Sequence, residues 1–495
     1  MNALLIYPKI PNTFWSFSYA VKFLKRKSAF PPLGLITIAK MLPKDWSLKL
    51  VDMNVKPLKK KDILWADIVF ISAMTIQRES VLSVIKMCRN FKKKTVAGGP
   101  LFTSEPFNFV DIDHLVLNEA EITLPQFLED LKNGKEKKIY STKEFADIRQ
   151  TPAPLLDILD LKKYASMSIQ YSRGCPFNCD FCNVTALFGH NPRVKKAEQI
   201  INELDNLYNS GWRRSVFFVD DNFIGNKKIL KTELLPALVK WREGKDGMPF
   251  FTEVSINIAD DEELMKLMVM AGFDTVFIGI ETPDDESLAE CSKHQNIKRN
   301  LIEDIKKIHS FGLQVQAGFI VGFDSDTEKS FEKLYEFIQE SGIVTAMVGL
   351  LQAPYGTRLY EKMKSLGRIK DNLTGDNTDC TTNIISIMDS ETLIKKYKKI
   401  VSELYSPKNY YKRVKTFLKD YKSIKSNEPK NFKFQIEQIR AFFRSIVKIG
   451  ILGKERFHYF RLLTWTFFHR PRYFSLAVSL AIYGYHFRKI AEINK

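Results

Sequence analysis

The sequence has few cysteines and no long apolar run. Six cysteines among 495 residues are too few for a disulfide framework. No apolar stretch approaches the roughly 20 residues that a membrane-spanning helix needs. The best candidate, 474–487, is short and contains His486. The chain runs from Met1 directly into a strand-like stretch and shows no signal-peptide pattern. These absences predict a protein of the reducing cytoplasm.

Positive charge is concentrated toward the C-terminus. The chain carries 75 Lys and Arg against 57 Asp and Glu, a net charge of +18. Residues 401–495 hold 20 Lys and Arg and 6 Asp and Glu, a net charge of +14, together with 20 of the 61 aromatic residues. Since a chain of this length corresponds to roughly three domains, we expect a nearly neutral body and a basic, aromatic C-terminal region.

Residues 1–132 alternate short strand patterns with helical ones. The strand-like stretches are 3–7, 48–52, 67–72, 95–97 and 114–117. This alternation predicts an α/β fold with a parallel, flavodoxin-like (Rossmann-type) sheet, whose ligands bind beyond the carboxyl ends of the strands. Those ends carry Ser72, Met74, Thr75, Gly98, Gly99, Asn118 and Glu119. The two glycines either let backbone approach a bulky ligand or form an ordinary turn.

A second α/β region follows a polar stretch, 133–160, that is predicted to be a linker. Within 161–366, strand patterns occur at 166–171, 215–219, 250–257, 275–280, 315–321 and 345–351. Six β/α units predict a partial (β/α)6 TIM barrel, because closure needs eight. Polar residues follow the strands, at the face where barrel chemistry takes place. Residues 367–495 are predicted to form a basic, aromatic helical domain.

Three cysteines lie within eight residues, directly after the first barrel strand. Cys175, Cys179 and Cys182 have the spacing CxxxCxxC. Thiolates bind soft metals and iron–sulfur clusters, and three of them can hold three irons of a 4Fe–4S cluster and leave the fourth iron open. His190 could complete a zinc site, which is the alternative. The dispersed Cys88, Cys291 and Cys380 are predicted to be structural.

In this position the motif, with Phe181 before its last cysteine, resembles the signature of radical S-adenosylmethionine (SAM) enzymes. The resemblance implies that the open iron binds the amino and carboxylate groups of SAM. One electron from the cluster would then cleave SAM to a 5′-deoxyadenosyl radical, which abstracts a hydrogen atom from an unactivated position. The cofactor supplies the difficult chemistry, and the protein orients and shields it.

The resemblance extends to the later strand ends. The family often has Gly-Gly-Glu after the second strand to bind the SAM amino group, whereas this chain has Asp220 and Asp221, either of which could serve. Glu281 resembles the ribose contact of the fourth-strand element. Gly318 and Gly322 resemble the fifth-strand element that backs the adenine. Taken singly, Glu281 could cap a helix and Gly322 could form a turn; their order and spacing favour a SAM site.

An α/β domain before such a barrel resembles the cobalamin-binding class of radical SAM enzymes. The stretches 31–35, 98–99 and 118–121 carry this likeness. It implies that Ser72, Met74, Thr75, Gly98, Gly99, Asn118 and Glu119 bind cobalamin. The Asp-x-His-x-x-Gly motif that supplies an axial histidine is absent, and the only histidine before residue 150 is His114, so we expect cobalt without a protein imidazole. A scaffold that has lost cobalamin is the alternative.

The stretch 350–360 and the basic tail resemble a subgroup that includes the hopanoid C-2 methylase and related lipid-modifying enzymes. Three interpretations of the tail stay open. Basic amphipathic stretches at 440–448 and 457–473 suit peripheral contact with the inner face of a membrane. Basic and aromatic residues also suit RNA, although no RNA-binding module is recognisable, so nucleic acid is disfavoured. The tail could equally be a packed helical cap.

Together these observations predict a cobalamin-dependent radical SAM methyltransferase that acts on an unactivated carbon of a hydrophobic, lipid substrate. A second SAM would remethylate the cobalamin, and an electron donor such as flavodoxin or ferredoxin would reduce the cluster. The alternatives are radical carbon–carbon coupling or ring formation, and a non-catalytic cobalamin or iron–sulfur sensor at the membrane surface. Transfer-RNA methylthiolation is disfavoured, because the chain has no second cysteine triad for an auxiliary cluster.

Overall fold

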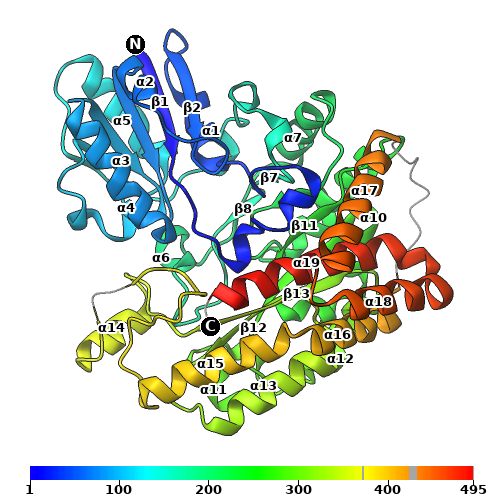
Figure 1. Ribbon diagram of the computed structural model, residues 1–495. Helices are drawn as coiled ribbons and strands as arrows, with labels where there is room; N and C mark the ends of the chain where they lie inside the picture. The colour runs from blue at the N-terminus through cyan, green and yellow to red at the C-terminus, as the bar shows by residue number, and fades with distance from the viewer. Residues whose placement is uncertain (371–372, 423–431, 494–495) are drawn as a thin grey trace.

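The computed structural model describes residues 1–370, 373–422 and 432–493. Two parallel sheets and a set of C-terminal helices make up the molecule. In Figure 1 the N-terminal sheet (blue) lies above the second sheet, and the orange and red C-terminal helices lie on the flank of the second sheet. In the described parts of the chain, no helix is both long enough and apolar enough to cross a membrane.

The N-terminal sheet has six parallel strands in the order β2-β1-β3-β4-β5-β6. They are β1 (Asn2–Tyr7), β2 (Ser47–Asp52), β3 (Ile68–Ser72), β4 (Lys94–Gly98), β5 (His114–Val116) and β6 (Ile139–Tyr140). The first five reproduce the predicted strands in the flavodoxin-like order. The sixth was not predicted: β6 lies inside the segment that the sequence analysis treats as a linker, and it pairs with β5 along the edge.

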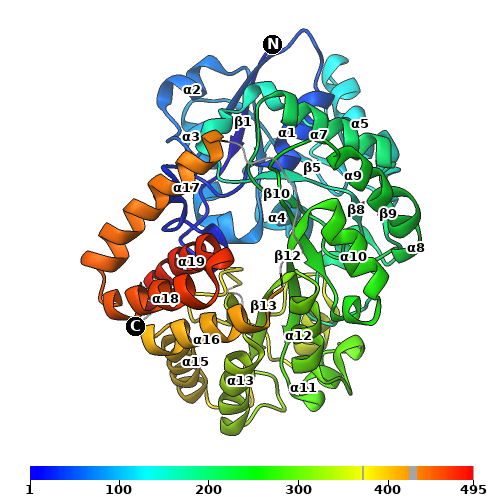
Figure 2. The ribbon, with the colours of Figure 1, turned by 90° about the vertical axis from the view of Figure 1, so that its right-hand side faces the viewer.

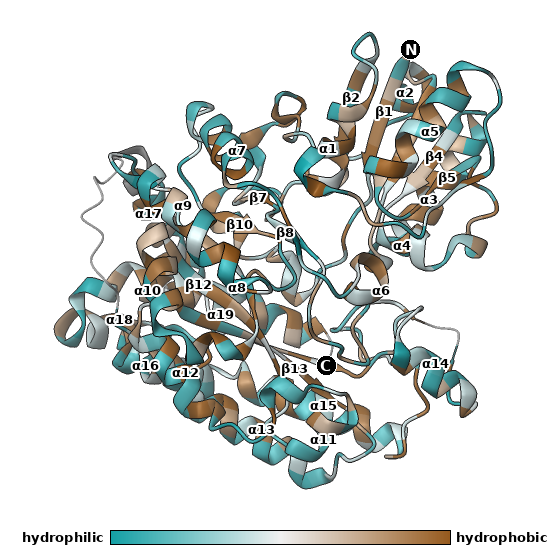
Figure 3. Ribbon diagram, turned by 180° about the vertical axis from the view of Figure 1, so that it is seen from behind, coloured by the Kyte–Doolittle hydropathy of each residue, from teal (hydrophilic) through white to brown (hydrophobic). Residues whose placement is uncertain are grey.

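Helices cover both faces of this sheet. They are α1 (Leu33–Met41), α2 (Lys60–Trp65), α3 (Arg78–Asn90), α4 (Pro100–Ser104) and α5 (Ala120–Lys132). Alternate residues of β1 point to opposite faces, so Leu4 and Ile6 pack with α2, α3 and α4, whereas Ala3 and Leu5 pack with α1 and α5. Burial on both faces explains why these strands are continuous apolar runs. Figure 3 shows the strands of this sheet mostly in brown.

The second sheet has six parallel strands in the order β14-β13-β12-β11-β10-β7. They are β7 (Met167–Ile169), β10 (Val216–Phe218), β11 (Phe250–Val254), β12 (Phe273–Glu281), β13 (Gln314–Val321) and β14 (Ala346–Leu350). Its helices include α7 (Ala197–Asn209), α9 (Leu235–Arg242), α10 (Glu262–Ala271), α12 (Leu301–Ser310) and α13 (Glu328–Ser341). The end strands β7 and β14 do not pair, so the barrel is open, as the six-unit count predicts.

The C-terminal region is helical and shares the core of the second sheet. Its helices are α14 (Arg358–Ser365), α15 (Ser390–Leu404), α16 (Pro407–Asp420), α17 (Phe432–Ser445), η11 (Ile446–Ile451), α18 (Arg456–His469) and α19 (Phe474–Ile493). Aromatic residues of α15, α16 and α19 belong to the same buried cluster as the barrel strands. The stretch 474–487, the most apolar in the tail, is therefore part of a packed helix.

The last helix, α19, also packs against the segment that follows β1. The short helix η1 (Phe14–Ser16) packs against α19, and Phe14 lies among Tyr405 and Phe487 with ring centroids 5.9 and 5.4 Å apart. The ring Nε2 of His486 lies 3.0 Å from the carbonyl oxygen of Phe14. This contact positions the segment between β1 and α1, which carries part of the wall of the site described next.

Candidate active site

The three clustered cysteines lie on a loop whose ends are held together by a two-stranded hairpin. β8 (Ser172–Arg173) pairs antiparallel with β9 (Arg193–Val194) and brackets residues 174–192. Gly174 has a φ of +94°, and a Cβ there would lie 2.9 Å from the carbonyl oxygen of Asn191. Glycine is therefore required directly before Cys175, because both the backbone angle and the close approach exclude a side chain.

The environment of the thiols suits metal ligands. Asn222 Nδ2 lies 3.9 Å from Cys175 Sγ, and Gln295 Nε2 lies 3.7 Å from Cys179 Sγ. Burial raises the pKa of the Cys175 thiol and raises the pKa of Cys182 to about 12. Such thiols need a positively charged partner to become thiolates. In the described chain no three Cys, His, Asp or Glu side chains converge on a single metal ion, and three thiols of one loop suit a multinuclear iron cluster.

The alternative zinc ligand, His190, is exposed to solvent. The outer side of the loop is instead held by Arg358 of α14. Its guanidinium donates to the carbonyl oxygen of Asn178 and lies 2.5 Å from Asp180 Oδ1. Asp180 also receives the backbone N–H of Leu359 at its carbonyl oxygen, at 2.9 Å. The cysteine loop is therefore bound from outside by the first helix of the C-terminal region.

The two aspartates after β10 have different positions. Asp220 is fully buried and accepts the backbone N–H groups of Tyr171 (3.1 Å) and Ser172, so it braces the base of the cysteine loop. Asp221 lines a cavity between the two sheets. Burial raises the pKa of Asp220 to about 7 and that of Asp221 to about 6. Of these two aspartates, both candidates for binding SAM, only Asp221 lines the cavity.

A third carboxylate, Glu253 of β11, lines the same cavity. Burial, reinforced by Asp221, Asp220 and Glu281, raises the pKa of Glu253 to about 8. The sequence analysis missed this residue. Its signal was an acidic residue inside a mostly apolar strand, Phe250–Val254.

Glu281 ends β12 and is held by a lysine. Its φ is +65°, at a register shift between β12 and β13. Lys293 Nζ lies 2.8 Å from Glu281 Oε1. Burial favours a lower pKa of Lys293, but the Glu281 carboxylate beside it outweighs this effect, so the pKa is raised. A Cβ on Gly279 would lie 2.9 Å from Lys293 Nζ, so a side chain there would displace the ends of the pair. The sequence analysis missed Lys293.

The two glycines of β13 and its end also differ. Gly318 lines the cavity. Gly322 has a φ of +99° and packs against Leu393 of α15, and its N–H donates to Asp326 Oδ2 at 2.7 Å. The structure therefore brings Gly318 to the candidate SAM site and places Gly322 in a turn beneath a C-terminal helix.

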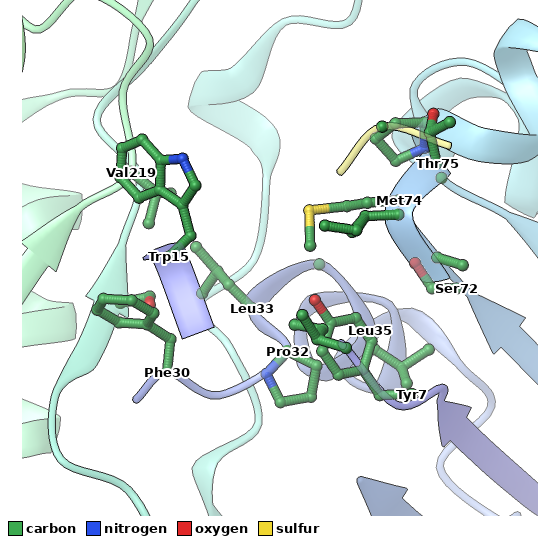
Figure 4. A pocket seen from close by; sticks show the side chains of 18 of the residues that line it. Tyr7, Trp15, Phe30, Pro32, Leu33, Leu35, Ser72, Met74, Thr75 and Val219 are labelled. Carbon is green, nitrogen blue, oxygen red and sulfur yellow. The ribbon is translucent and has the colours of Figure 1, made fainter. Parts of the chain in front are cut away.

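On the opposite side, the carboxyl ends of β3 and β4 form a cradle. A Cβ on Gly98 would lie 2.5 Å from the carbonyl oxygen of Val116, and one on Gly99 would lie 2.9 Å from Ser72 Oγ. Met74 and Thr75 line the cavity beside them, and Figure 4 shows their side chains across the space from Trp15 and Phe30. Asn118 also lines this wall, with a φ of +61°. The absence of a Cβ at Gly98 and Gly99 therefore makes room for Val116 and Ser72, and both glycines line the cavity.

Glu119 borders the cavity, but its carboxylate is already bound by protein groups. It accepts from Arg173 Nη1 at 2.7 Å and from Arg193 Nη1 at 2.8 Å. It also receives the backbone N–H of Ala146 at 2.8 Å. Arg173 in turn binds Glu121 at 2.8 Å. The structure therefore places Glu119 in a network that joins the N-terminal domain to the base of the cysteine loop.

One cavity of about 1190 Å³ between the two sheets is lined by residues from each of these parts: Phe181 and Asn183 of the cysteine loop, Asp221, Glu253, Glu281, Gly318, and the glycines Gly98 and Gly99. Cys175, Cys179 and Cys182 themselves are not among the described residues that line it. The third wall of the cavity is aromatic and was not predicted. Trp15 lies 4.7 Å from Phe277, ring centroid to ring centroid, and Phe30 lies 5.3 Å from Phe217. Trp15 and Phe30 lie in the segment between β1 and α1, which packs against α19. This segment shows no periodic pattern in the sequence. The cavity therefore combines a cysteine loop, strand-end carboxylates, a glycine cradle and an apolar wall.

Comparisons with known proteins match the two α/β regions to separate families. The model of the Radical SAM superfamily matches residues 169–338, and that of the B12 binding domain matches residues 20–128. The chain is 35% identical to the hopanoid C-2 methylase of Rhodopseudomonas palustris (strain TIE-1) over 417 residues, which are 83% of this chain and 78% of that protein. The chain belongs to the family of cobalamin-binding radical SAM methyltransferases. This confirms the family predicted from the sequence, with its 4Fe–4S cluster, SAM and cobalamin.

This radical SAM methyltransferase has other relatives. It is 40% identical to an uncharacterized methyltransferase of Synechocystis sp. (strain ATCC 27184 / PCC 6803 / Kazusa), over all of this chain and 92% of that protein. Its fold is similar to that of the cobalamin-dependent SAM radical enzyme OxsB, with a TM-score of 0.64 at 15% identity, covering 94% of this chain and 75% of OxsB. Residues 357–495 match a domain of unknown function (DUF4070).

Proposed function

We propose that this methyltransferase methylates an unactivated carbon of a hydrophobic, polycyclic lipid. One observation carries the proposal: the cysteine loop, the glycine cradle and an aromatic wall all face a single cavity. A radical reaction needs its hydrogen acceptor, its methyl donor and its substrate in one water-poor space, because radicals react with whatever is nearest. An aromatic wall is suited to an apolar substrate and excludes water.

The residues fit the cofactors of the family. Cys175, Cys179 and Cys182 would hold the cluster, and the cradle at Gly98 and Gly99 would receive cobalamin. Asp221 and the Glu281–Lys293 pair offer charges of both signs, which suit the ammonium, sulfonium and carboxylate groups of SAM. When bound, the cluster and the cobalamin supply the electron and the methyl group of the reaction.

The protein itself orients the substrate and shields it from water. Trp15, Phe30 and Phe277 would hold the substrate by apolar contact, and the segment at Trp15 is fixed by the contact of α19 with Phe14. Asp221 and Glu253 both line this part of the wall, and the pKa values of both carboxyl groups are raised. Binding of the cationic SAM would favour their ionised forms, because opposite charges attract.

The relatives support the choice of lipid. The chain is 35% identical to the hopanoid C-2 methylase and 25% identical to the hopanoid C-3 methylase of Methylococcus capsulatus, the latter over 62% of this chain. Other relatives are named as bacteriochlorophyllide methyltransferases, for example at 24% identity over 83% of this chain. Both substrate classes are large, apolar ring systems, which agrees with an aromatic wall. The greater identity favours a hopanoid-like lipid over a chlorin.

The test is an anaerobic turnover assay. The protein with reconstituted cluster and cobalamin is given SAM, a flavodoxin or ferredoxin system as electron donor, and hopanoid lipid in detergent. We expect 5′-deoxyadenosine, S-adenosylhomocysteine and a lipid product heavier by one CH2 unit. A variant with Trp15→Ala should lose lipid methylation while it still cleaves SAM, because the apolar wall and not the cluster is damaged.

Each other outcome has a defined meaning. A chlorin methylated in place of the hopanoid would overturn the lipid assignment and keep the methyltransferase. Formation of 5′-deoxyadenosine with a coupled or cyclised product and no added CH2 would overturn methyl transfer. No cleavage of SAM with any of these substrates, in a protein that holds its cluster, would favour the sensor alternative.

A further inference from the structure

The C-terminal helices leave one apolar face without protein cover. Along α17 and η11 this face consists of large apolar side chains spaced by about one helical turn: Ile439, Phe443, Val447, Ile451 and Leu452. Leu452 is 75% exposed and Phe443 is 61% exposed. Such spacing places the side chains on one side of a helix. The opposite side is buried by Ala441, Ser445 and Ile449, so the helix is already packed on its inner face.

Helix α18 continues the same face with four phenylalanines: Phe457, Phe460, Phe467 and Phe468. Phe457 is 75% exposed and Phe468 is 74% exposed. The two stretches touch, because a Cβ on Gly450 of η11 would lie 2.8 Å from the ring of Phe460. Figure 2 shows α17 (orange) and α18 (red) at one outer edge of the molecule. We call these nine residues the α17–α18 face.

Positively charged residues surround the α17–α18 face. Between residues 438 and 475 the chain has eight Lys and Arg and one acidic residue, Glu455. The carboxylate of Glu455 is buried and bound by Arg488, so it offers no free negative charge. Exposed cations stand among the apolar residues: Arg440, Lys448, Lys454, Arg456, Arg461 and Arg472. A surface of this kind is both apolar and cationic.

We propose that the α17–α18 face docks this enzyme on the surface of an anionic lipid bilayer. Apolar side chains enter the boundary between headgroups and acyl chains, while Lys and Arg meet the lipid phosphates. This assigns a role to part of the region that matches the domain of unknown function. It rests on geometry outside the cavity, and its test needs no turnover.

Charge argues for lipid against a second copy of this chain. A twofold contact would set the cationic surface against itself, and the repulsion between like charges would oppose the association. The aliphatic members of the face argue against RNA. Ile439, Val447, Ile451 and Leu452 present no ring to stack on a base and no polar group to read one, whereas all four gain by entering hydrocarbon.

The face also adjoins the cavity. The short helix η2 (Val21–Leu24) packs against α17, and Arg444 Nη1 donates to the carbonyl oxygen of Phe23 at 2.5 Å. Lys448 Nζ lies 5.2 Å from the centre of the Phe23 ring. Lys22, which precedes Phe23 in η2, is exposed and lines the cavity. One short helix therefore lies between the docking face and the wall of the cavity, which suits a substrate drawn from the bilayer.

The experiment is vesicle co-sedimentation of the full chain. The vesicles contain phosphatidylcholine alone or phosphatidylcholine with phosphatidylglycerol, at low and high salt. We expect binding to the anionic vesicles that weakens at high salt, because surface charges are screened. The double variant Leu452→Ser with Phe457→Ser should lower the partition coefficient about tenfold or more, since it removes two large apolar groups from the boundary.

Matched controls come from the other end of the molecule. Phe107 and Val110 of the N-terminal domain are 84% and 74% exposed, so Phe107→Ser with Val110→Ser removes a comparable exposed pair and should leave binding unchanged. For charge, Arg456→Gln with Arg461→Gln should weaken binding to anionic vesicles, and Lys135→Gln with Lys143→Gln should not.

Several results would overturn the proposal. One is a wild-type chain that stays in the supernatant with anionic vesicles. Another is equal loss of binding in the Leu452/Phe457 variant and the Phe107/Val110 control. A wild-type dimer that this variant converts to a monomer, with no vesicle binding, would assign the face to a second copy. Tight binding to RNA without vesicle binding would assign it to nucleic acid. Turnover with detergent-solubilised lipid should be retained by the variant, which separates docking from the proposed reaction.

Discussion

Arg173 Nη2 lies 2.8 Å from the carboxylate of Glu121, and through this contact the base of the cysteine loop is bound to the N-terminal domain. Arg173 stands two residues before Cys175, and its Nη1 also binds Glu119. The Glu119 side chain is 2% exposed and that of Arg173 is 12% exposed, so the ions are almost fully removed from water. The relative position of the cluster site and the cobalamin cradle therefore depends on a buried ion network.

Removal of the Arg173 side chain should loosen this junction. We expect Arg173→Ala to lower the free energy of unfolding by about 3–5 kcal/mol, because the buried Glu121 loses its cation and Glu119 keeps only Arg193. Urea unfolding of the apoprotein, followed by circular dichroism, measures the change. The control Arg149→Ala breaks an exposed pair with Asp147 and should leave the free energy of unfolding nearly unchanged. Equal midpoints for the two variants would contradict the role of the network.

Each cysteine of the loop should be needed for the cluster. Cys175→Ala, Cys179→Ala and Cys182→Ala should each abolish the 4Fe–4S absorbance after reconstitution and the cleavage of SAM, because each removes one thiolate ligand. Cys88→Ala is the control, since Cys88 is buried in the core of the N-terminal sheet and should keep both signals. An intact cluster in the triple variant would refute the assignment of these ligands.

Lys293 should act on SAM through Glu281. Lys293→Met keeps the length of the side chain but leaves the buried carboxylate of Glu281 without its cation. We expect the dissociation constant for SAM to rise about tenfold or more, in line with the loss of a charge-assisted hydrogen bond. Equilibrium dialysis with the reconstituted protein measures it. Lys298→Met alters an exposed lysine of the same loop and should leave SAM affinity unchanged; an equal effect of both changes would refute the role of Lys293.

The raised pKa of Glu253 predicts a pH dependence of stability. Its folded-state pKa is about 8 against a usual 4.5, so the folded protein retains a proton that the unfolded chain releases. Stability is therefore lost as the pH rises between these two values. Glu253→Gln cannot ionise, and we expect it to exceed the wild-type apoprotein by about 1–2 kcal/mol at about pH 8.5 and to match it near pH 4.

Thermal or urea unfolding across this pH range provides the measurement. Glu243→Gln, an exposed change at the end of α9, should follow the wild-type curve at every pH. A Glu253→Gln variant whose stability falls with pH as steeply as the wild type would show that Glu253 is ionised already at low pH.

The amino-acid sequence predicted those features that depend on neighbours along the chain. Five strands of the first sheet and all six of the second were found, because apolar runs bounded by polar stretches mark buried parallel strands. The cysteine motif was found because its three cysteines lie within eight residues of one another in the sequence. The strand β6 was missed because Ile139–Tyr140 is short and flanked by lysines, so it has no periodic signal.

Side-chain roles that depend on distant partners could not be obtained this way. Glu119 follows a strand end, where a ligand contact is a reasonable expectation, yet its partner Arg173 lies 54 positions away. Asp220 and Asp221 are adjacent in sequence, and only their opposite directions at the end of β10 make one a brace and the other a cavity residue. Lys293 is recognisable only when the loop after β12 brings it to Glu281.

The C-terminal tail shows the same division. By sequence, α16, α18 and α19 have the same aromatic character, and a helical region was predicted there. Which aromatic residues are buried was decided by tertiary structure: Tyr410 and Phe487 fill the core, while Phe457 and Phe468 remain in solvent. The physical reason is that periodicity defines a helix face, but only the neighbours brought together by folding determine whether that face is covered.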